Sequence, residues 1–136
     1  MSSIISVRTR GHSVTEITPQ VENEVAKSGM DKGLVHLFIQ HTSASLTIQE
    51  NADPDVTHDL ISWLDQTVPE SGPYRHTAEG PDDMPAHIKS MITNTSLIIP
   101  FANGQLLTGT WQGIFVLEHR RADHQRRIVV TLMNEA

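Results

Sequence analysis

Three of the eight histidines lie in polar, turn-like segments where they could take part in chemistry: His41, His76 and His87. Neutral imidazole with neighbouring carboxylates is the usual ligand set of a zinc-type site. The same groups also act as general acids and bases near neutral pH. The polar side chains around them in the sequence are Asn51, Asp53, Asp55, Glu79, Asp82 and Asp83. These residue types predict either a divalent metal site, with zinc or magnesium bound by the three histidines, or an acid–base site.

The spacing of these histidines leaves simpler alternatives open. No two of the three are four residues apart, the spacing that places two ligands on one face of a zinc-binding helix. Each could therefore be a structural or an exposed side chain. All three lie at predicted boundaries of helices and strands, where sites are usually built, and this favours their convergence.

Two more polar positions have both a structural and a functional interpretation. Asp53, before Pro54, is typical of a helix start, but it could also bind an ion, orient a ligand histidine or act as a base. Arg75 could pair with a phosphate or carboxylate through two hydrogen bonds, or it could be an ordinary exposed arginine of a loop.

The segment Gly109-Thr110-Trp111-Gln112-Gly113 places an indole and an amide between two glycines. Glycine within a sheet permits close approach of another backbone or of a ligand. Trp111 could be a core residue, whereas packing explains Gln112 less well. Glu118, on the same strand face as Gln112, is either a buried acid at the site or an exposed side chain.

Composition excludes several classes of protein. The absence of cysteine excludes disulfides and thiolate metal sites, and the net charge of −6 argues against a general nucleic-acid binder. Four arginines gather near the end of the chain, either as a solvated hairpin end or as an anion clamp: Arg120, Arg121, Arg126 and Arg127. No apolar run approaches the roughly 20 residues of a membrane helix, and no secretory leader is recognised, so we expect a soluble cytoplasmic protein. The sequence contains no motif typical of nucleophilic hydrolases and no glycine-rich phosphate-binding loop.

The hydropathy pattern predicts mostly strands. Predicted strands cover residues 3–9, 13–18, 34–39, 44–49, 97–101, 106–110, 114–118 and 127–133, with a hairpin at Asn103-Gly104. Predicted helices follow Thr18 as N-cap up to Gly29, follow Asp53 as N-cap up to Pro69, and cover residues 84–93. The second has an apolar stripe at helical spacing, formed by Val56, Leu60, Trp63, Leu64 and Thr67, and the third has Ile88, Met91 and Ile92 on one face. Residues 69–85 form a long loop, which at this length is usually functional or disordered.

This order predicts a β-rich α+β fold, with two packed antiparallel sheets in a sandwich-like arrangement and about three short helices. A chain of 136 residues is expected to form one domain over residues 1–136. The continuous apolar run at residues 34–39 indicates a strand that is covered on both faces.

The chain also resembles a known family, the YjbQ family. The similar motifs are His41-Thr42-Ser43-Ala44, Asn51-Ala52-Asp53-Pro54-Asp55-Val56, Tyr74-Arg75-His76, Glu79-Gly80, Met84-Pro85-Ala86-His87-Ile88-Lys89 and Gly109-Thr110-Trp111-Gln112-Gly113. The last resembles the family's signature, and the matches span nearly the whole chain in family order. Members are often labelled secondary thiamine-phosphate synthase enzymes.

The resemblance implies a compact β-rich domain that assembles as a homotrimer, with a polar pocket near a subunit boundary and a weak, secondary synthase activity. Carried over residue by residue, that pocket contains His41, Asn51, Asp53, His76, Glu79, His87, Trp111 and Gln112. The metal-ligand role of the three histidines is a hypothesis of our own beyond this resemblance.

Our first hypothesis is a metal-assisted enzyme that acts on a small phosphorylated metabolite. His41, His76 and His87 bind the ion, and Asp53, Glu79 and Asn51 are the candidate catalytic residues. Substrate contacts are expected from Arg75, Trp111, Gln112 and Ser43. The alternatives are a non-catalytic trimeric binding module for a small anionic metabolite, and histidines that merely stabilise the trimer.

Overall fold

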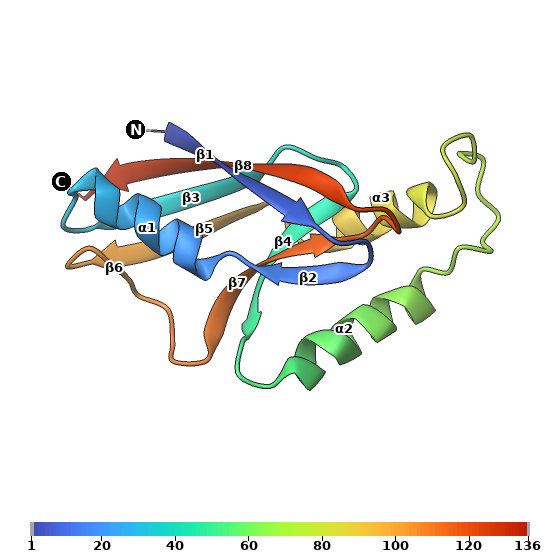
Figure 1. Cartoon of the computed structure of the whole chain (residues 1–136), viewed down its shortest axis with the longest axis horizontal. Coiled ribbons are helices and arrows are strands. Elements are labelled where there is room, and N and C mark those ends of the chain that lie inside the picture. The colour runs from blue at the N-terminus through green and yellow to red at the C-terminus, as the bar shows by residue number, and fades with distance from the viewer. Residues whose placement is uncertain (1, 136) are drawn as a thin grey trace.

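The computed structural model describes residues 2–135, which form two antiparallel sheets and three helices (Figure 1). A five-stranded sheet has the order β1-β8-β3-β5-β6, and a three-stranded sheet has the order β2-β7-β4. The strands are β1 (Ser2–Thr9), β2 (Ser13–Glu16), β3 (Gly33–Ile39), β4 (Ala44–Glu50), β5 (Ser96–Ala102), β6 (Gln105–Leu106), β7 (Gln112–Glu118) and β8 (His124–Asn134). The helices are α1 (Thr18–Ser28), α2 (Pro54–Thr67) and α3 (Asp83–Ile92). The predicted β-rich α+β class is confirmed.

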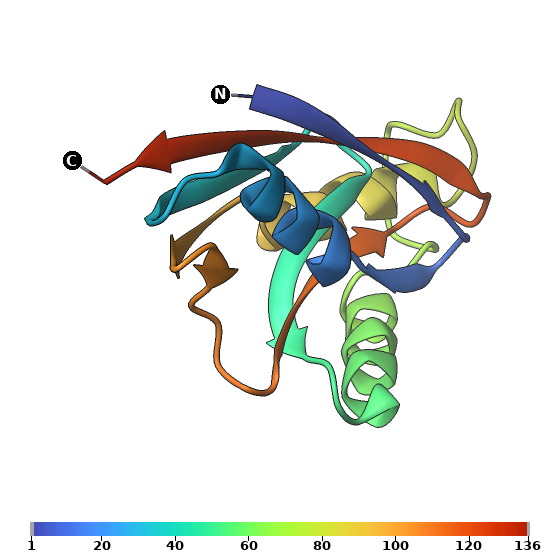
Figure 2. The same ribbon diagram turned by 60° about the vertical axis from the view of Figure 1, so that its left-hand side comes forward.

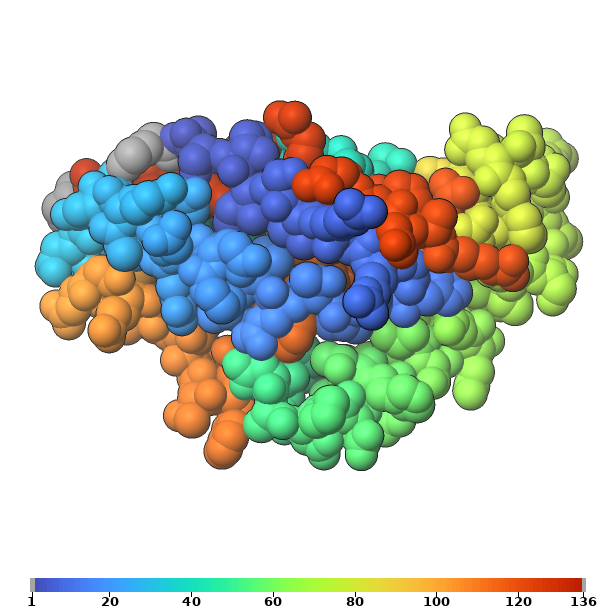
Figure 3. Space-filling view, viewed as in Figure 1, coloured from blue at the N-terminus to red at the C-terminus, as the bar shows by residue number. Residues whose placement is uncertain are grey.

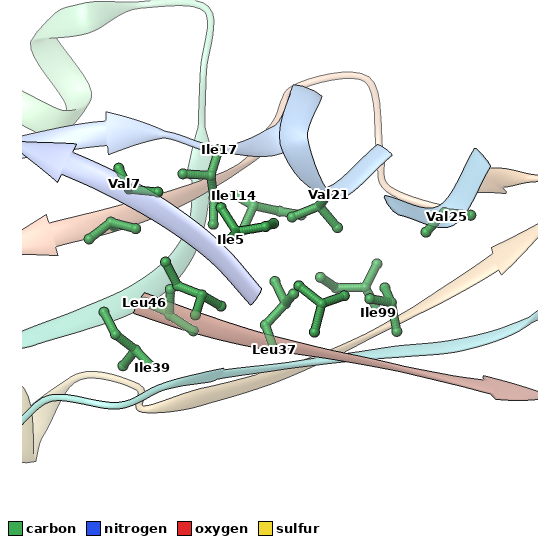
Figure 4. Close-up of a cluster of buried hydrophobic side chains, with 14 of the residues drawn as sticks. Ile5, Val7, Ile17, Val21, Val25, Leu37, Ile39, Leu46, Ile99 and Ile114 are labelled. Carbon is green, nitrogen blue, oxygen red and sulfur yellow. The ribbon is translucent and has the colours of Figure 1, made fainter. Parts of the chain in front are cut away.

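The core lies between the two sheets and α1 (Figure 4). Val21 and Val25 lie one helical turn apart on α1 and are completely buried. They face the inward side chains of the five-stranded sheet, such as Leu37 and Ile99. Figure 2 shows α1 held against this sheet, with β4 curving past it. Burial of these aliphatic side chains is the main favourable term in folding.

Within one chain, strand β3 is covered on only one face. The prediction that both of its faces are covered is therefore wrong for the isolated chain. Val35, Leu37 and Ile39 are buried, whereas Leu34 and Phe38 on the opposite face are 40% and 44% exposed. No helix within residues 2–135 is long and apolar enough to span a membrane.

The beginning of α1 differs from the expectation, whereas its end agrees with it. The N-cap position is Ile17 rather than Thr18. The Thr18 hydroxyl instead donates to Glu16 Oε2 at 2.8 Å and accepts from the Ile114 backbone N–H at 2.8 Å. Thr18 therefore joins the helix to the small sheet. Gly29 ends the helix in the left-handed conformation, as predicted.

Helix α2 has the predicted ends but not the expected apolar face. Asp53 Oδ1 accepts from the Asp55 N–H at 2.9 Å, which confirms the N-cap, and the helix ends before Pro69. Of the predicted stripe, Leu64 is buried while Trp63 is 58% exposed. The apolar stripe therefore exists, but most of its side chains are exposed rather than packed against the rest of the chain.

In α3 the expected orientation is reversed. The sequence places Met91 and Ile92 on the buried face, yet both are exposed. The buried face is instead largely polar, because its side chains have specific partners: Lys89 Nζ donates to Asp65 Oδ1 at 2.6 Å, and the Ser90 hydroxyl donates to the Ala44 carbonyl at 3.3 Å.

The β5–β6 hairpin turns at Asn103 and Gly104, both at positive φ, as predicted. The strand expected at residues 106–110, however, ends at Leu106. Just beyond it the Leu107 N–H still donates to the Pro100 carbonyl at 2.9 Å, and the Gly109 N–H then donates to Gln112 Oε1 at 2.8 Å. The described chain thus contains a loop at residues 107–111 where a strand was predicted.

Candidate metal centre

Two of the three singled-out histidines converge on one carboxylate. Asp83 Oδ2 lies 2.6 Å from His76 Nε2 and 3.0 Å from His87 Nε2. One ligand atom from each of the three residues lies within 4.8 Å of the other two. Metal–ligand bonds of about 2.0–2.2 Å place neighbouring ligand atoms about 3 Å apart. These residues, which we call the metal centre, therefore form a group that could hold a metal ion.

The hydrogen bonding of His87 fixes which ring nitrogen is available. His87 Nδ1 lies 2.9 Å from the backbone carbonyl of Thr42, which can only accept, so Nδ1 carries the hydrogen. In the neutral ring the lone pair is then on Nε2 and points at Asp83 Oδ2. Two atoms that each carry a lone pair repel each other at 3.0 Å unless a cation lies between them, either a proton or a metal ion. An N–H to carbonyl hydrogen bond behind the ligand nitrogen is typical of metal-binding histidines.

Asp83 is held from behind by an arginine. Arg120 Nη1 lies 2.8 Å from Asp83 Oδ1, leaving Oδ2 for the two imidazoles. Burial by itself would raise the pKa of Asp83, which is 2% exposed, but hydrogen bonds with His76 and Glu79 and the charges of His87 and Arg120 lower that pKa below its usual value. The carboxylate is therefore ionised and directed at neutral pH.

Asp82 anchors the same arginine. Its Oδ2 accepts from Arg120 Nε and from the Arg121 backbone N–H, both at 2.9 Å. Burial opposes ionisation of Asp82, yet these two hydrogen bonds and the Arg120 charge lower its pKa to about 2. The Arg120 guanidinium is thus held between the adjacent carboxylates of Asp82 and Asp83, which fixes the orientation of Asp83.

The ligands come from one helix and the loop before it. Asp83 and His87 are four residues apart on α3 and share a face of that helix. His76 comes from the loop between α2 and α3, which lies beside α3 at one end of the molecule (Figure 1). Sequence reasoning did not assign Asp83 as a ligand. Its signal was present, because Asp83 lies four residues before His87, immediately ahead of the helix predicted at residues 84–93, and so has the same spacing as a pair of zinc-binding histidines.

Glu79 and Arg75 lie on the same loop as His76. Glu79 Oε2 is 3.9 Å from His76 Nε2, and the Glu79 carbonyl accepts from Arg120 Nη2 at 3.0 Å. Arg75 is exposed and directly precedes His76. The Glu79 carboxylate thus lies near His76 and hydrogen-bonds Asp83, and Arg75 belongs to the same exposed loop.

His41 is placed outside this group. Its Nε2 accepts a hydrogen bond from the Arg127 backbone N–H at 2.9 Å, and Arg126 Nη1 lies 3.3 Å from its Nδ1. Burial and the charge of Arg126 lower the pKa of His41, so the ring is neutral at pH 7. Its acceptor nitrogen is engaged by the protein backbone. Ser43, another predicted site residue, accepts from Arg126 Nη2 at 3.1 Å through its hydroxyl.

The remaining predicted residues gather at a second place, formed by residues 50–53 and 107–113, which we call the Trp111 end. Trp111 is 64% exposed, and its carbonyl accepts from the Asn51 N–H at 3.0 Å. Asn51 Nδ2 also donates to Glu16 Oε2 at 3.2 Å. Asp53 caps α2, and Gln112 accepts from Gly109. Gly113 allows this packing, because a Cβ there would lie 2.8 Å from Asn51 Cβ.

The Trp111 end and the loop that carries His76 project from different sides of the molecule. In Figure 3 the orange segment that contains Trp111 protrudes beside α2, away from the yellow-green loop. Figures 1 and 2 show the same separation. Within one chain, therefore, Asn51, Asp53, Trp111 and Gln112 do not border the metal centre.

Three of the four clustered arginines, Arg120, Arg121 and Arg126, pair with acids, which neither interpretation of the sequence anticipated. Arg121 pairs with Glu70 at the surface. Arg126 is buried and forms a two-pronged ion pair with Glu118, with Nε 2.7 Å from Oε1 and Nη2 against Oε2. Burial would raise the pKa of Glu118, but hydrogen bonds from Arg126 and Thr9 lower it. Glu118 is thus a buried, charged acid, as one of its two interpretations held.

Comparison with known proteins agrees with the fold. A family model described as "UPF0047 protein YjbQ-like" matches residues 3–135. The UPF0047 protein sll1880 of Synechocystis sp. is 50% identical over 133 residues, which are 97% of this chain and 90% of that protein. The UPF0047 protein YjbQ of Escherichia coli is 47% identical over 132 residues, 96% of this chain and 94% of that one. The chain belongs to the YjbQ/UPF0047 family, and the predicted family membership is confirmed.

Solved structures show the same architecture. An uncharacterized conserved protein of this family from Clostridium acetobutylicum superimposes with a TM-score of 0.89 at 38% identity, covering 96% of this chain and 99% of that one. A conserved hypothetical protein from Thermus thermophilus gives a TM-score of 0.86 at 34% identity over the same shares. These descriptions state no activity, so the function has to be argued from the site.

Proposed function

We propose that this protein is a metal-assisted enzyme that acts on a small phosphorylated metabolite, with the ion held by His76, Asp83 and His87. One observation carries the proposal. The Thr42 carbonyl accepts from His87 Nδ1, so His87 presents Nε2 to the Asp83 carboxylate at 3.0 Å, where a proton or a metal ion has to lie between the two atoms. A divalent cation would bind His87 Nε2, the Asp83 carboxylate and also His76 Nε2, which lies 2.6 Å from the same Asp83 oxygen.

The donor set favours a zinc-class ion over magnesium. Two imidazoles and one carboxylate form a borderline ligand set, which suits zinc and its transition-metal neighbours. Magnesium prefers oxygen ligands in octahedral geometry. Three protein ligands also leave a position open for water or substrate, as in catalytic rather than structural zinc sites.

When bound, such an ion would lower the pKa of its water ligand and polarise a phosphoryl oxygen. The chain's own groups supply the rest. The exposed Glu79 carboxylate, 3.9 Å from His76 Nε2, can accept a proton from an attacking water. Arg75 can pair with a phosphate through two hydrogen bonds. Arg120 keeps Asp83 ionised and oriented while these groups act.

A cavity on the Thr42 side of His87 offers room for a small metabolite. It has a volume of about 520 Å³ and is lined by Phe38, Ile39, Gln40, His41, Thr42, Ser43 and Thr95. Small-molecule sites usually measure about 300–1,000 Å³. The Thr42 carbonyl, which binds His87 Nδ1, links this cavity to the metal centre. Ser43 lines the cavity, so its predicted substrate contact stays part of the proposal, whereas His41 offers no free lone pair to a metal ion.

The secondary thiamine-phosphate synthase activity implied by the family resemblance is compatible with this proposal. Joining a pyrimidine diphosphate to a thiazole phosphate requires an ion to hold the diphosphate and a cationic side chain near it. The metal centre and Arg75 could meet these needs. The dedicated synthases are (β/α)₈ barrels, whereas this chain is a small β-rich domain, so we treat the synthase reaction as a side activity.

The decisive test is metal content and turnover in the same preparations. Untagged protein, purified without chelator, is analysed for bound metal and screened against phosphate monoesters and diphosphates. We expect one zinc-class ion per chain, lost in Asp83→Asn and His87→Gln, with turnover lost in parallel. His58→Gln, at an exposed histidine of α2, is the matched control and should retain both.

Each alternative predicts a distinct result. No metal in the wild type would overturn the proposal. Metal binding with tight ligand binding but no turnover would point instead to a non-catalytic module for an anionic metabolite. Loss of assembly in His76→Gln or His87→Gln, without any effect on bound metal, would show that the histidines stabilise the oligomer.

We further propose self-association, with a homotrimer as the expected state. The outward face of the five-stranded sheet supports it, because this face presents exposed apolar side chains: Leu34, Phe38, Ile98 and Met133. Contiguous apolar surface usually marks an interaction site. Light scattering after size-exclusion chromatography measures the mass directly. We expect three times 15.1 kDa, and Phe38→Glu should reduce that mass to a monomer's.

A further inference from the structure

A buried ion pair is connected to the metal centre by an unbroken series of contacts. It begins at Glu118, which is 1% exposed and accepts from Thr9 Oγ1 at 2.6 Å and from Arg126 Nε at 2.7 Å. Desolvating two charges costs several kcal/mol per ion. Replacing such a pair with apolar residues is often neutral or stabilising. Stability alone therefore does not explain why this core contains one.

The guanidinium of Arg126 reaches beyond Glu118 to the segment between β3 and β4, residues 40–43, which we call the β3–β4 linker. Its Nη2 donates to the Ser43 carbonyl at 3.2 Å and to the Ser43 hydroxyl at 3.1 Å. Its Nη1 lies 3.3 Å from His41 Nδ1, which carries the ring hydrogen because Nε2 accepts from the Arg127 N–H, so this approach is a packing contact and not a hydrogen bond. One side chain thus contacts the residues on both sides of Thr42.

Thr42 is the point where the linker meets the metal centre. Its carbonyl accepts from His87 Nδ1 at 2.9 Å and so determines which His87 nitrogen faces Asp83. The linker has no regular secondary structure after Ile39 and before Ala44. Backbone hydrogen bonds hold its two ends, from the Gln40 N–H to the Arg127 carbonyl at 3.1 Å and from the His119 N–H to the Ser43 carbonyl at 3.3 Å, and Arg126 supplies side-chain contacts on both sides of Thr42.

We propose that Arg126, held by Glu118, is a positioning residue that sets the Thr42 carbonyl and thereby the tautomer and orientation of His87. This inference rests on the proposed metal site, because Arg126 affects metal affinity only if His87 binds the metal. Outer-shell partners of ligand histidines raise that affinity. Loss of such a partner typically lowers metal affinity by about 10–100-fold. The planar fork of arginine is needed, since a lysine ammonium could neutralise Glu118 but could not span from His41 to Ser43.

The test is Arg126→Lys, which keeps the charge opposite Glu118 and removes the fork. The matched control is Arg121→Lys, because the side chain of Arg121 pairs with Glu70 at the surface. Two readouts are measured: Zn²⁺ affinity by chelator competition, and the His87 tautomer by two-bond ¹H–¹⁵N correlation NMR on metal-free protein. A role limited to stability would lower the melting temperature without changing the tautomer.

We expect Arg126→Lys to lower Zn²⁺ affinity about tenfold and to shift His87 from the Nδ1–H form to a mixture of tautomers. Arg121→Lys should change neither. If Arg126→Lys does not fold, Ser43→Ala removes one acceptor of the fork and should weaken Zn²⁺ binding about threefold. A folded variant with wild-type tautomer and affinity would overturn the inference. A wild type with the Nδ1–H form but no Zn²⁺ binding would overturn the proposed function alone.

Discussion

The metal centre and the Trp111 end contain similar residue types but differ in the partners of their polar atoms. At the Trp111 end, Asp53 accepts from its own helix and Gln112 accepts from its own loop. At the metal centre, Asp83 Oδ2 meets two imidazole nitrogens, from His87 on its own helix and from His76 on the preceding loop, while Arg120 binds Oδ1. The acceptors of Asp53 and Gln112 are thus satisfied by backbone N–H groups, whereas at the metal centre two side-chain nitrogens are directed at one carboxylate oxygen.

The largest expected difference between the two ends is in metal affinity. Asp83→Asn removes the charged member of the proposed ligand set, while Arg120 stays paired with Asp82, so Zn²⁺ affinity should fall by more than about 1,000-fold, or about 4 kcal/mol. Asp53→Asn keeps a capping side chain and should leave the affinity unchanged. Chelator competition measures both. Equal losses in the two variants would mean that the Trp111 end contributes to the same site.

The second expected effect is a loss of stability at acid pH, and it arises at the buried His119 rather than at either of the two ends. His119, next to Glu118, is 2% exposed and bonds Ser45 Oγ through Nε2 at 2.8 Å. Burial, followed by the charge of Lys89, lowers its pKa from 6.5 to about 4. Above pH 6.5 the ring is neutral in both states, so stability is fully present. As the pH falls toward 4, only the unfolded state takes up the proton, and about 3 kcal/mol is lost from this residue.

Denaturant unfolding between pH 7 and pH 4 checks this dependence. In His119→Gln the fall in unfolding free energy should be shallower by that amount, whereas His58→Gln, at an exposed position, should follow the wild type. A wild-type slope in His119→Gln would contradict a neutral buried ring.

The third expected effect concerns the helix cap at the Trp111 end. Asp53→Ala should lower the free energy of unfolding by about 1 kcal/mol, because the N-terminal N–H groups of α2 lose an acceptor. Asp55→Ala, which removes only a charge from the first turn, should cost about 0.5 kcal/mol. Neither should alter Zn²⁺ binding. Loss of bound metal in Asp53→Ala would show that this carboxylate has more than a structural role.

The smallest expected effect is at Trp111 itself. Because the indole is 64% exposed, Trp111→Ala should change the unfolding free energy of the dilute protein by no more than about 0.5 kcal/mol. Leu37→Ala, in the core, should cost about 2–5 kcal/mol. A loss above about 2 kcal/mol in Trp111→Ala would mean that the assembled protein covers this side chain.

Much of the fold could be predicted because its determinants are local. The Asp53 cap, the Gly29 stop and the Asn103–Gly104 turn each depend on the conformational preference of one or two residues. The reversed face of α3 could not be predicted in this way. Its buried Lys89 has a partner on another helix, and hydropathy contains no information about partners.

The candidate site was predictable only in part for the same reason. His76 and His87 were singled out by type and setting, and Asp83 could have been found from its spacing to His87. The separation of His41 from this group depends on a hydrogen bond from Arg127, 86 residues further along the chain. No local pattern indicates such a contact.

The sequence by itself determined the family, the β-rich class and the positions of its turns and caps, because these follow from periodicity, motif similarity and local backbone preference. Only the tertiary structure decided that one carboxylate joins His76 and His87, and that the Thr42 carbonyl turns the His87 lone pair toward it. The physical reason is that a lone pair becomes available through the hydrogen bonds its residue makes elsewhere, and those partners are brought together only by folding.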